Sequence, residues 1–227
     1  MDKNTFHIIE QFMLEKAGDS AHDRAHIERV LFGALDIARY EENADLDVLI
    51  AACLLHDIAR PLQAKDERVC HARAGAEMAY GFLNQIGWCE DKAAHVRDSI
   101  RTHRFRIDDT PATIEAKILY DSDKLDVTGA LGIARTLQYG GSMSEPLYAL
   151  DENGGILLEG GGADVSTFFQ EYHFKLKKLY GRFYTERAAA LAQEREKTMT
   201  DFCDALYREV SETLKNGRAA LDEALAE

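Results

Sequence analysis

The pattern of apolar and polar positions is helical along most of the chain. Residues 4–17 form one amphipathic segment, and Gly18 separates it from a second segment over residues 21–42. Asp19 or Ser20 is a suitable cap residue for the second segment. Both segments are predicted to be helices. The apolar stripe of the second recurs at steps of three and four residues and consists of Ile27, Val30, Leu31, Ala34, Leu35 and Ala38.

Residues 45–60 are nearly all apolar up to the pair His56–Asp57. A helix that is apolar on every side is surrounded by protein, so we expect this one at the centre of the fold. Pro61 is predicted to end it. A threonine followed by proline, Thr110–Pro111, is predicted to start a later helix. The remaining predicted helices cover about 68–86 (ending near Gly87), 90–105, 111–126, 165–182 and 185–215.

Residues 139–163 break the helical pattern with several glycines and Pro146. This segment is predicted to be a loop, and a short hairpin or a mobile flap are the alternatives for it. We therefore expect an all-α protein with a single domain over residues 1–227. Its core would span about 20–136, followed by the loop or flap and a C-terminal helical extension over about 165–215.

The composition limits the classes of partner. The chain has 227 residues, of which 46% are hydrophobic, and a formal net charge of -13. An acidic surface repels nucleic-acid polymers and anionic membranes, so neither is expected as a partner. A small phosphorylated substrate would be repelled as well, unless a cation and local arginines reversed the field at its binding site.

The cysteines Cys53, Cys70, Cys89 and Cys203 form no CxxC pair, which favours a reducing compartment. Cys53 lies in an apolar run and is expected to be a buried free thiol. The N-terminal segment lacks a signal-peptide core, and no apolar run approaches the roughly 20 residues of a membrane helix. We expect a cytoplasmic protein.

Histidines and aspartates recur on positions predicted to face inwards. His26 lies on or beside the apolar stripe of its helix, and His56–Asp57 follows the most apolar helix. The others are His71, His103, Asp121 and Asp123. Imidazoles and carboxylates held by separate helices are the ligands that a divalent transition metal requires. The alternative is that these histidines are structural residues of a helical scaffold that binds no metal.

The order H…HD…D on successive helices resembles the HD superfamily of metal-dependent phosphohydrolases. The resemblance covers nearly the whole chain and is carried by the stretches 20–30 (SAHDRAHIERV), 51–61 (AACLLHDIARP), 71–79, 100–105 and 114–136. Residues 171–199 are similar to a bacterial subgroup that includes nucleoside-triphosphate pyrophosphatases. The resemblance implies an HD-type helical bundle.

The resemblance also implies metal ligands, which are His26, His56, Asp57 and Asp123. Helical geometry alone leaves Asp121 and Asp123 as alternatives pointing about 160° apart, and the family pattern, in which the aspartate precedes Lys-Leu, favours Asp123. Asp121 would then be a cap or a partner of a ligand.

His71 and His103 match positions that hold a second metal in two-metal relatives and that contact phosphate or the attacking water in one-metal relatives. Arg60 and Lys124 are candidates for binding a phosphate oxygen, with a salt bridge as the alternative for each. Arg73 and Arg104 have the same two interpretations. Some nucleotide-hydrolysing relatives carry a glutamate shortly after HD, where this chain has Ile58, Ala59 and Arg60.

The expected reaction is hydrolysis of a phosphoanhydride or phosphoester in a small phosphorylated substrate, a nucleotide above all, by a metal-activated water. Its cofactor would be one divalent ion, or two. Nitrogen and oxygen ligands favour manganese or iron, with cobalt, nickel, zinc and magnesium as alternatives. The competing functions are a one- or two-metal phosphodiesterase, including one for cyclic nucleotides, a phosphomonoesterase, and a non-catalytic nucleotide sensor. A homo-oligomer is possible.

Overall fold

The structure is a computed structural model that describes residues 1–16, 24–104, 109–158 and 167–226. Within these ranges the regular structure is helical, apart from one isolated antiparallel bridge between Leu150 and Ile156. The all-α prediction is confirmed. The chain divides into two compact units, Met1–Asp126 with Phe183–Ala190, and Val127–Arg182 with Leu191–Glu227. The expected single domain over 1–227 stays a prediction.

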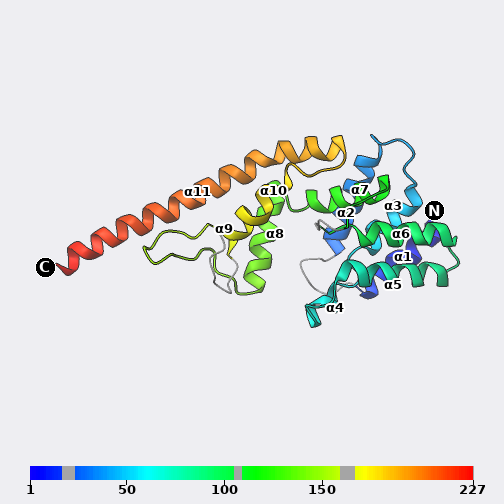
Figure 1. Ribbon diagram of the computed structural model, residues 1–227, viewed down its shortest axis with the longest axis horizontal. Coiled ribbons are helices and arrows are strands. Elements are labelled where there is room, and N and C mark those ends of the chain that lie inside the picture. Colours follow the sequence, from blue (N-terminus) through cyan, green and yellow to red (C-terminus); the bar gives the residue numbers. More distant parts are fainter. Residues whose placement is uncertain (17–23, 105–108, 159–166, 227) are drawn as a thin grey trace. The chain divides into compact units, whose positions relative to one another are not determined.

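The first unit is a bundle of helices around α3 (Figure 1). Helix α3 contacts α1, α2, α5, α6 and α7. Val48, Leu49 and every residue from Ala51 to Leu55 are buried, so the expectation of a central helix is confirmed. The helices of this unit are α1 (Lys3–Lys16), α2 (Arg24–Ala38), α3 (Leu46–Leu55), α4 (Arg60–Lys65), α5 (His71–Gln85), α6 (Glu90–Arg101) and α7 (Ile114–Leu125).

The predicted helix over 45–60 is shorter than expected. Helix α3 ends at Leu55, His56 is its C-cap residue, and residues 56–59 form a turn before α4. Pro61 lies in the first turn of α4, where its missing N–H removes no hydrogen bond. The expectation that Pro61 ends the helix is therefore wrong. The HD pair lies in the turn between two helices.

One other predicted boundary moves, and one is confirmed. Helix α7 is capped by Thr113, whose hydroxyl accepts from the N–H of Ala116 at 3.3 Å, so the predicted start at Thr110–Pro111 is wrong by three residues. Helix α5 ends before Gly87, whose φ of 83° explains why glycine stands there. The proposed cap residues Asp19 and Ser20 lie outside the described residues, as do residues 17–23 in general.

Helices α2 and α7 are in close contact at Gly33. The Ser122 hydroxyl donates to the carbonyl of Val30 at 2.6 Å. A Cβ at Gly33 would lie 2.6 Å from that hydroxyl oxygen, so glycine is required for this approach. The contact lies one residue from Asp123, and it fixes the position of that residue against α2.

The second unit contains α8 (Gly129–Ser142), α9 (Phe168–Glu171), the π-helix η1 (Tyr172–Leu176), α10 (Lys177–Leu179) and the part of α11 (Glu186–Leu225) that begins at Leu191. The predicted helix over 165–182 is therefore three consecutive helical segments, and residues 165 and 166 are not among those described. Helix α11 continues well past the predicted end at 215. The core of the unit consists of Ile133, Phe168, Tyr172, Leu176, Leu179, Met199 and Cys203.

The segment predicted to be a loop begins later than expected, because α8 extends to Ser142. Its described part contains a short hairpin around the bridge between Leu150 and Ile156, one of the two alternatives for this segment. The Asp151 carboxylate accepts from the N–H groups of Asn153 and Gly155, both at 2.8 Å. Residues 159–163 lie outside the described part, and a role as a flap stays a prediction.

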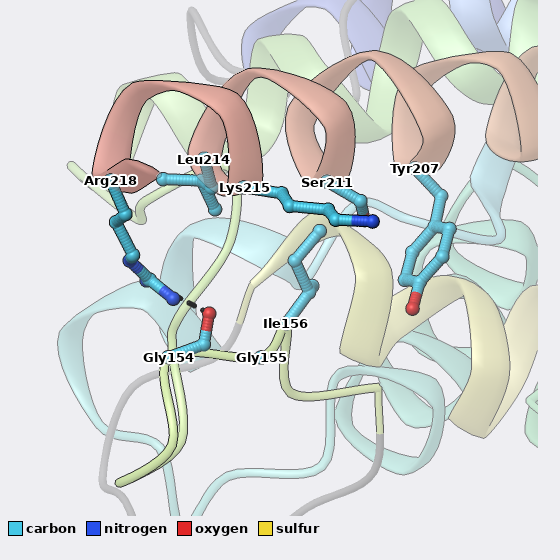
Figure 2. A pocket seen from close by; sticks show the side chains of 8 residues that line it. All are labelled: Gly154, Gly155, Ile156, Tyr207, Ser211, Leu214, Lys215 and Arg218. Carbon is cyan, nitrogen blue, oxygen red and sulfur yellow. Dashed lines mark hydrogen bonds between the residues drawn. The ribbon is translucent and has the colours of Figure 1, made fainter. Parts of the chain in front are cut away.

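The tip of the hairpin forms a hydrogen bond with α11. Arg218 donates to the carbonyl of Gly154 at 2.9 Å (Figure 2). Between the hairpin and the helix lies an open cavity of about 350 Å³, lined by Gly154, Gly155, Ile156, Tyr207, Ser211, Leu214, Lys215 and Arg218. Among the described helices, none is both long and apolar enough to cross a membrane.

Candidate metal centre

Six of the residues singled out by the sequence are brought together inside the first unit. They come from different elements: His26 from α2, His56 and Asp57 from the turn after α3, His71 from the first position of α5, His103 from just after α6, and Asp123 from the last turns of α7. All four histidines are 0% exposed, and both aspartates are buried. Burying these groups is costly unless they share partners or a cation.

The first cluster consists of His26, His56 and Asp123, whose donor atoms lie within 4.8 Å of one another. The Nε2 atoms of His26 and His56 are 3.3 Å apart. Oδ1 of Asp123 lies 3.6 Å from Nε2 of His26. Oδ2 of Asp57 also faces this cluster, at 3.7 Å from His26 Nε2 and 3.6 Å from His56 Nε2.

The second cluster consists of Asp57, His71 and His103. The Nε2 atoms of the two histidines are 3.3 Å apart. Oδ1 of Asp57 lies 3.4 Å from His71 Nε2 and 3.5 Å from His103 Nε2. The Asp57 carboxylate therefore faces both clusters, one oxygen toward each.

Each of the four imidazoles has its other nitrogen, Nδ1, against an oxygen acceptor. Nδ1 of His56 donates to the carbonyl of Cys53 at 2.7 Å, and Nδ1 of His103 donates to that of Ile100 at 2.6 Å. Nδ1 of His71 pairs with the amide oxygen of Gln63. Nδ1 of His26 pairs with Oδ2 of Asp126 at 2.7 Å.

A carbonyl or carboxylate acceptor requires a proton on Nδ1, so in the neutral form of each ring Nε2 carries a lone pair. Lone pairs facing each other at 3.3 Å repel unless a cation lies between them. Nitrogen and oxygen ligands lie about 2.0–2.2 Å from a transition metal ion, which separates neighbouring donors by roughly 3–3.5 Å. The distances in both clusters are close to this range, so these side chains fit a divalent metal ion.

The electrostatics favour the metal-binding forms of these groups. Burial lowers the pKa of His56 to about 4 and that of His71 to about 2, so both imidazoles are neutral at pH 7. Burial by itself raises the pKa of Asp123, but the charge of Lys124 beside it holds that pKa well below its usual value. The sites therefore offer neutral nitrogens and an ionised oxygen.

The four cations proposed for phosphate binding have different surroundings. Nε of Arg60 donates to Oδ1 of Asp57 at 2.9 Å, and Nζ of Lys124 donates to Oδ2 of Asp123. Nη1 of Arg104 lies 3.6 Å from the sulfur of Cys70. Nη2 of Arg73 pairs with Oδ2 of Asp109 at 4.0 Å. The salt-bridge interpretation of Arg60 and Lys124 thus describes their contacts here, and phosphate binding stays a prediction.

Asp121 does not face either cluster. It accepts hydrogen bonds from the N–H groups of Tyr184 and Thr185 and from the Thr185 hydroxyl, just before α11 begins. Asp121 therefore holds Tyr184 and Thr185 in place before α11, whereas the N–H of Ala188 within α11 is capped by the Thr185 hydroxyl. Burial raises its pKa to about 6.

Sequence reasoning missed Asp126 and Gln63, which hold the Nδ1 atoms of His26 and His71. Asp126 follows Asp123 by three residues, one helical turn, and this spacing was the available signal. Gln63 had none, since α4 was not predicted as a separate helix.

The chain is similar to known proteins. Residues 24–128 match the model of the HD domain family. A relative that is 30% identical over 198 residues is covered to 85% of its length and covers 84% of this chain. The chain therefore belongs to the HD domain family. That relative is the protein YpgQ of Bacillus subtilis.

Solved structures agree with this assignment. A protein from Lactobacillus plantarum superposes with a TM-score of 0.75 at 26% identity, covering 93% of this chain and 99% of its own. A predicted HD superfamily hydrolase from an uncultured Thermotogales bacterium gives 0.58 at 30% identity, with coverages of 91% and 92%. YpgQ in complex with ADP gives 0.69 at 27% identity, with coverages of 90% and 97%.

Proposed function

We propose that this protein is a metal-dependent phosphohydrolase that cleaves a phosphoanhydride or phosphoester bond in a small nucleotide. The observation that carries the proposal is the convergence of four buried imidazole Nε2 atoms on the carboxylates of Asp57 and Asp123. A scaffold with structural histidines has no need to hold four lone pairs toward one another.

The nucleotide in this proposal is supported by a relative and by the cationic side chains beside the two clusters. YpgQ has been crystallised with ADP, a nucleoside diphosphate. A chain with a net charge of -13 attracts such an anion only at a place where positive charge is concentrated. Arg60, Lys124 and Arg104 lie at or next to the residues of the two clusters and supply part of that charge.

The metal ligands in this proposal are His26, His56, Asp57 and Asp123. A divalent ion bound there would supply a water of lowered pKa and a Lewis acid for a phosphoryl oxygen. Mixed nitrogen and oxygen donors favour manganese or iron. The side chains of Arg60 and Lys124 would offset charge on the phosphoryl group by turning from their present carboxylate partners toward substrate oxygens.

A second candidate, a two-metal enzyme of the phosphodiesterase type, is favoured by the cluster of Asp57, His71 and His103. In the one-metal enzyme, His71 and His103 would instead contact the phosphate or the attacking water. The two candidates differ in metal content. Elemental analysis of the wild type and of His71→Ala and His103→Ala separates them, because only a two-metal protein loses one of two ions in these variants.

The test of the proposed function combines a substrate panel with a variant of the first cluster. Metal-free protein is reloaded with Mn²⁺ and assayed against nucleoside mono-, di- and triphosphates and cyclic dinucleotides, with products identified. We expect turnover of at least one nucleotide, and we expect His56→Ala and Asp57→Ala to lose metal and activity together while the helical circular dichroism signal is retained. Wild-type turnover in either variant would contradict the proposal.

A matched control keeps the comparison specific. His95 pairs with the carboxylate of Glu115 at 3.0 Å, away from both clusters. His95→Ala should therefore keep its metal and its turnover. Binding of nucleotides by the wild type without any product would instead indicate a sensor, and loss of metal in none of the cluster variants would indicate a structural role for the histidines.

A further inference from the structure

Asp126, which none of the sequence motifs assigned, contacts the candidate ligand His26. It is the C-cap residue of α7, its side chain is buried, and its Oδ2 lies 2.7 Å from Nδ1 of His26. The two residues are 100 positions apart in the sequence. Asp126 also lies one helical turn after Asp123, so the same end of α7 carries a candidate ligand and the partner of another.

Arg29 holds the Asp126 carboxylate from the other side. Its Nε donates to Oδ1 at 2.7 Å and its Nη2 donates to Oδ2 at 3.1 Å. A two-pronged bond of this kind fixes the plane of the carboxylate. Arg29 lies three residues after His26 on α2, so one helix supplies both the imidazole and the guanidinium that flank Asp126.

This contact determines the protonation pattern of the His26 ring. An ionised carboxylate only accepts hydrogen bonds, so the ring proton must be on Nδ1. Nε2 then carries its lone pair toward His56, Asp57 and Asp123. A carboxylate behind the ring also makes Nε2 a stronger donor to a metal than the neutral carbonyls behind His56 and His103 do.

We propose that Asp126, held by Arg29, is a positioning residue that sets the tautomer and orientation of His26 and thereby tightens metal binding. The inference rests on the proposed metal-dependent function. Asp126 would be a fifth residue of the site, beside the four candidate ligands. It would contact no metal itself, but it would determine how His26 binds the metal.

The first measurement is the affinity of the 227-residue chain for Mn²⁺ in the absence of substrate, by calorimetry. Removing a carboxylate behind a ligating histidine costs about 10- to 100-fold in metal affinity, and we expect Asp126→Ala to fall in that range. Arg29→Met keeps the carboxylate but releases it, so a smaller loss is expected. Asp36→Asn is the control, because Asp36 also lies on α2 and also pairs with an arginine, Arg187 at 2.9 Å.

The second measurement is the tautomer of His26 in metal-free protein, from the ¹⁵N shifts of the two ring nitrogens after ¹⁵N-histidine labelling. The signals are assigned by their loss in His26→Gln. In the wild type and in Asp36→Asn, we expect the proton on Nδ1. In Asp126→Ala, we expect the shifts to move toward the form with the proton on Nε2, which a purely structural role of Asp126 would not cause.

The outcomes separate this inference from the proposed function. If the wild type binds no Mn²⁺, the proposed function fails. The role of Asp126 in metal binding then fails as well, whichever tautomer of His26 is observed. If the wild type binds Mn²⁺ but Asp126→Ala binds it within twofold and keeps the Nδ1 tautomer, only the role of Asp126 is overturned. Should Asp126→Ala not fold, unchanged affinity and unchanged ring shifts in Arg29→Met would overturn it.

Discussion

At the scale of single residues, the candidate centre depends on which oxygen atom forms a hydrogen bond with Nδ1 of each histidine ring. The order of histidines and aspartates in the sequence, taken together with the resemblance to the HD superfamily, selected His26, His56, Asp57 and Asp123 as candidates. It was not sufficient to find Asp126 or Gln63, because a residue behind a ring is defined by the direction of the ring in space. Spacing along the chain determines which face of a helix a side chain occupies, and it does not determine the side chain's rotamer.

The four cysteines give a prediction at this scale. Cys53 and Cys203 are buried, and burial raises the pKa of both thiols, that of Cys203 to about 12. At pH 8 these thiols remain protonated and unreactive, since the thiolate is the nucleophile. We expect a short treatment with iodoacetamide at pH 8 to alkylate Cys89, which is exposed, and to leave Cys53 and Cys203 unmodified.

Peptide mass spectrometry distinguishes the four sites. The same treatment in denaturant is the control, because unfolding removes the burial and all four thiols should then react. Alkylation of Cys53 in the folded protein at the rate of Cys89 would contradict the packing described for α3.

At the scale of helices, boundaries were harder to predict than the helices themselves. The apolar run of α3 predicted its burial, but not that the chain turns at His56–Asp57 and begins a new helix at Arg60. Proline is compatible with both the end of one helix and the first turn of the next. Thr110 and Thr113 are both acceptable caps, and only the packing of α7 selects Thr113.

The contact between α2 and α7 predicts a coupling between Gly33 and Ser122. In the wild type, Gly33→Ala should destabilise the protein by about 1–3 kcal/mol, because the new methyl group displaces the Ser122 hydroxyl from the Val30 carbonyl. In a Ser122→Ala background, the same change should stabilise it by up to about 1 kcal/mol, since alanine is the better helix former. Urea unfolding of the four proteins of this cycle measures the change of sign.

Equal effects of Gly33→Ala in the two backgrounds would show that the helices do not approach as described. The Mn²⁺ affinity of the same four proteins is informative as well, because Ser122 adjoins Asp123. We expect it to be weakened in Gly33→Ala and restored in the double variant.

The start of α3 predicts a dependence of stability on pH. The Asp45 side chain caps α3 by accepting from the N–H groups of Asp47 and Val48. Partial burial raises the pKa of Asp45, but the hydrogen bond from Lys92 and the backbone N–H groups outweigh burial and hold the pKa below 3.8. Because the folded pKa is the lower one, this stabilisation is present above about pH 4 and is lost as the pH falls through the folded pKa.

We therefore expect Asp45→Ala to cost about 1 kcal/mol at pH 7 and less at pH 3. Chemical unfolding of both proteins at the two pH values measures this difference. Asp98→Ala is the control, because Asp98 is an exposed residue paired with its neighbour Arg97 and caps no helix. A cost that is independent of pH would mean that the Asp45 carboxylate is not held in its ionised form by Lys92.

At the scale of the whole molecule, the sequence predicted the all-α class and the family, and the division into two compact units was not expected. That division cuts α11 between Ala190 and Leu191, within a continuous helix. Periodicity reports that a helix continues, and it carries no signal about which core each turn packs on. All candidate metal ligands lie in the first unit.

Binding of a metal ion should therefore stabilise the protein, because the ion binds the folded state and not the unfolded one. In the proposed function, the ion would bind the folded arrangement of His26, His56, Asp57 and Asp123, which is absent from the unfolded chain. At a free Mn²⁺ concentration of 100 times Kd, the expected gain is about 2.7 kcal/mol. Thermal unfolding with Mn²⁺ and after chelation measures it, and His56→Ala should show no such difference. An unchanged Tm in the wild type would favour structural histidines.

The hydrogen bonds and the burial of the histidine rings affect the competition between protons and a metal ion. Histidines that are protonated before an ion arrives must discard a proton to admit it, and cation and proton then compete. Nδ1 of His56 lies against a carbonyl oxygen and Nδ1 of His71 against an amide oxygen, and burial disfavours a second proton on both rings. An ion bound at these nitrogens would therefore expel no hydrogen ion from His56 or His71, so neither ring should make the heat of metal uptake depend on the ionisation enthalpy of a phosphate-free buffer.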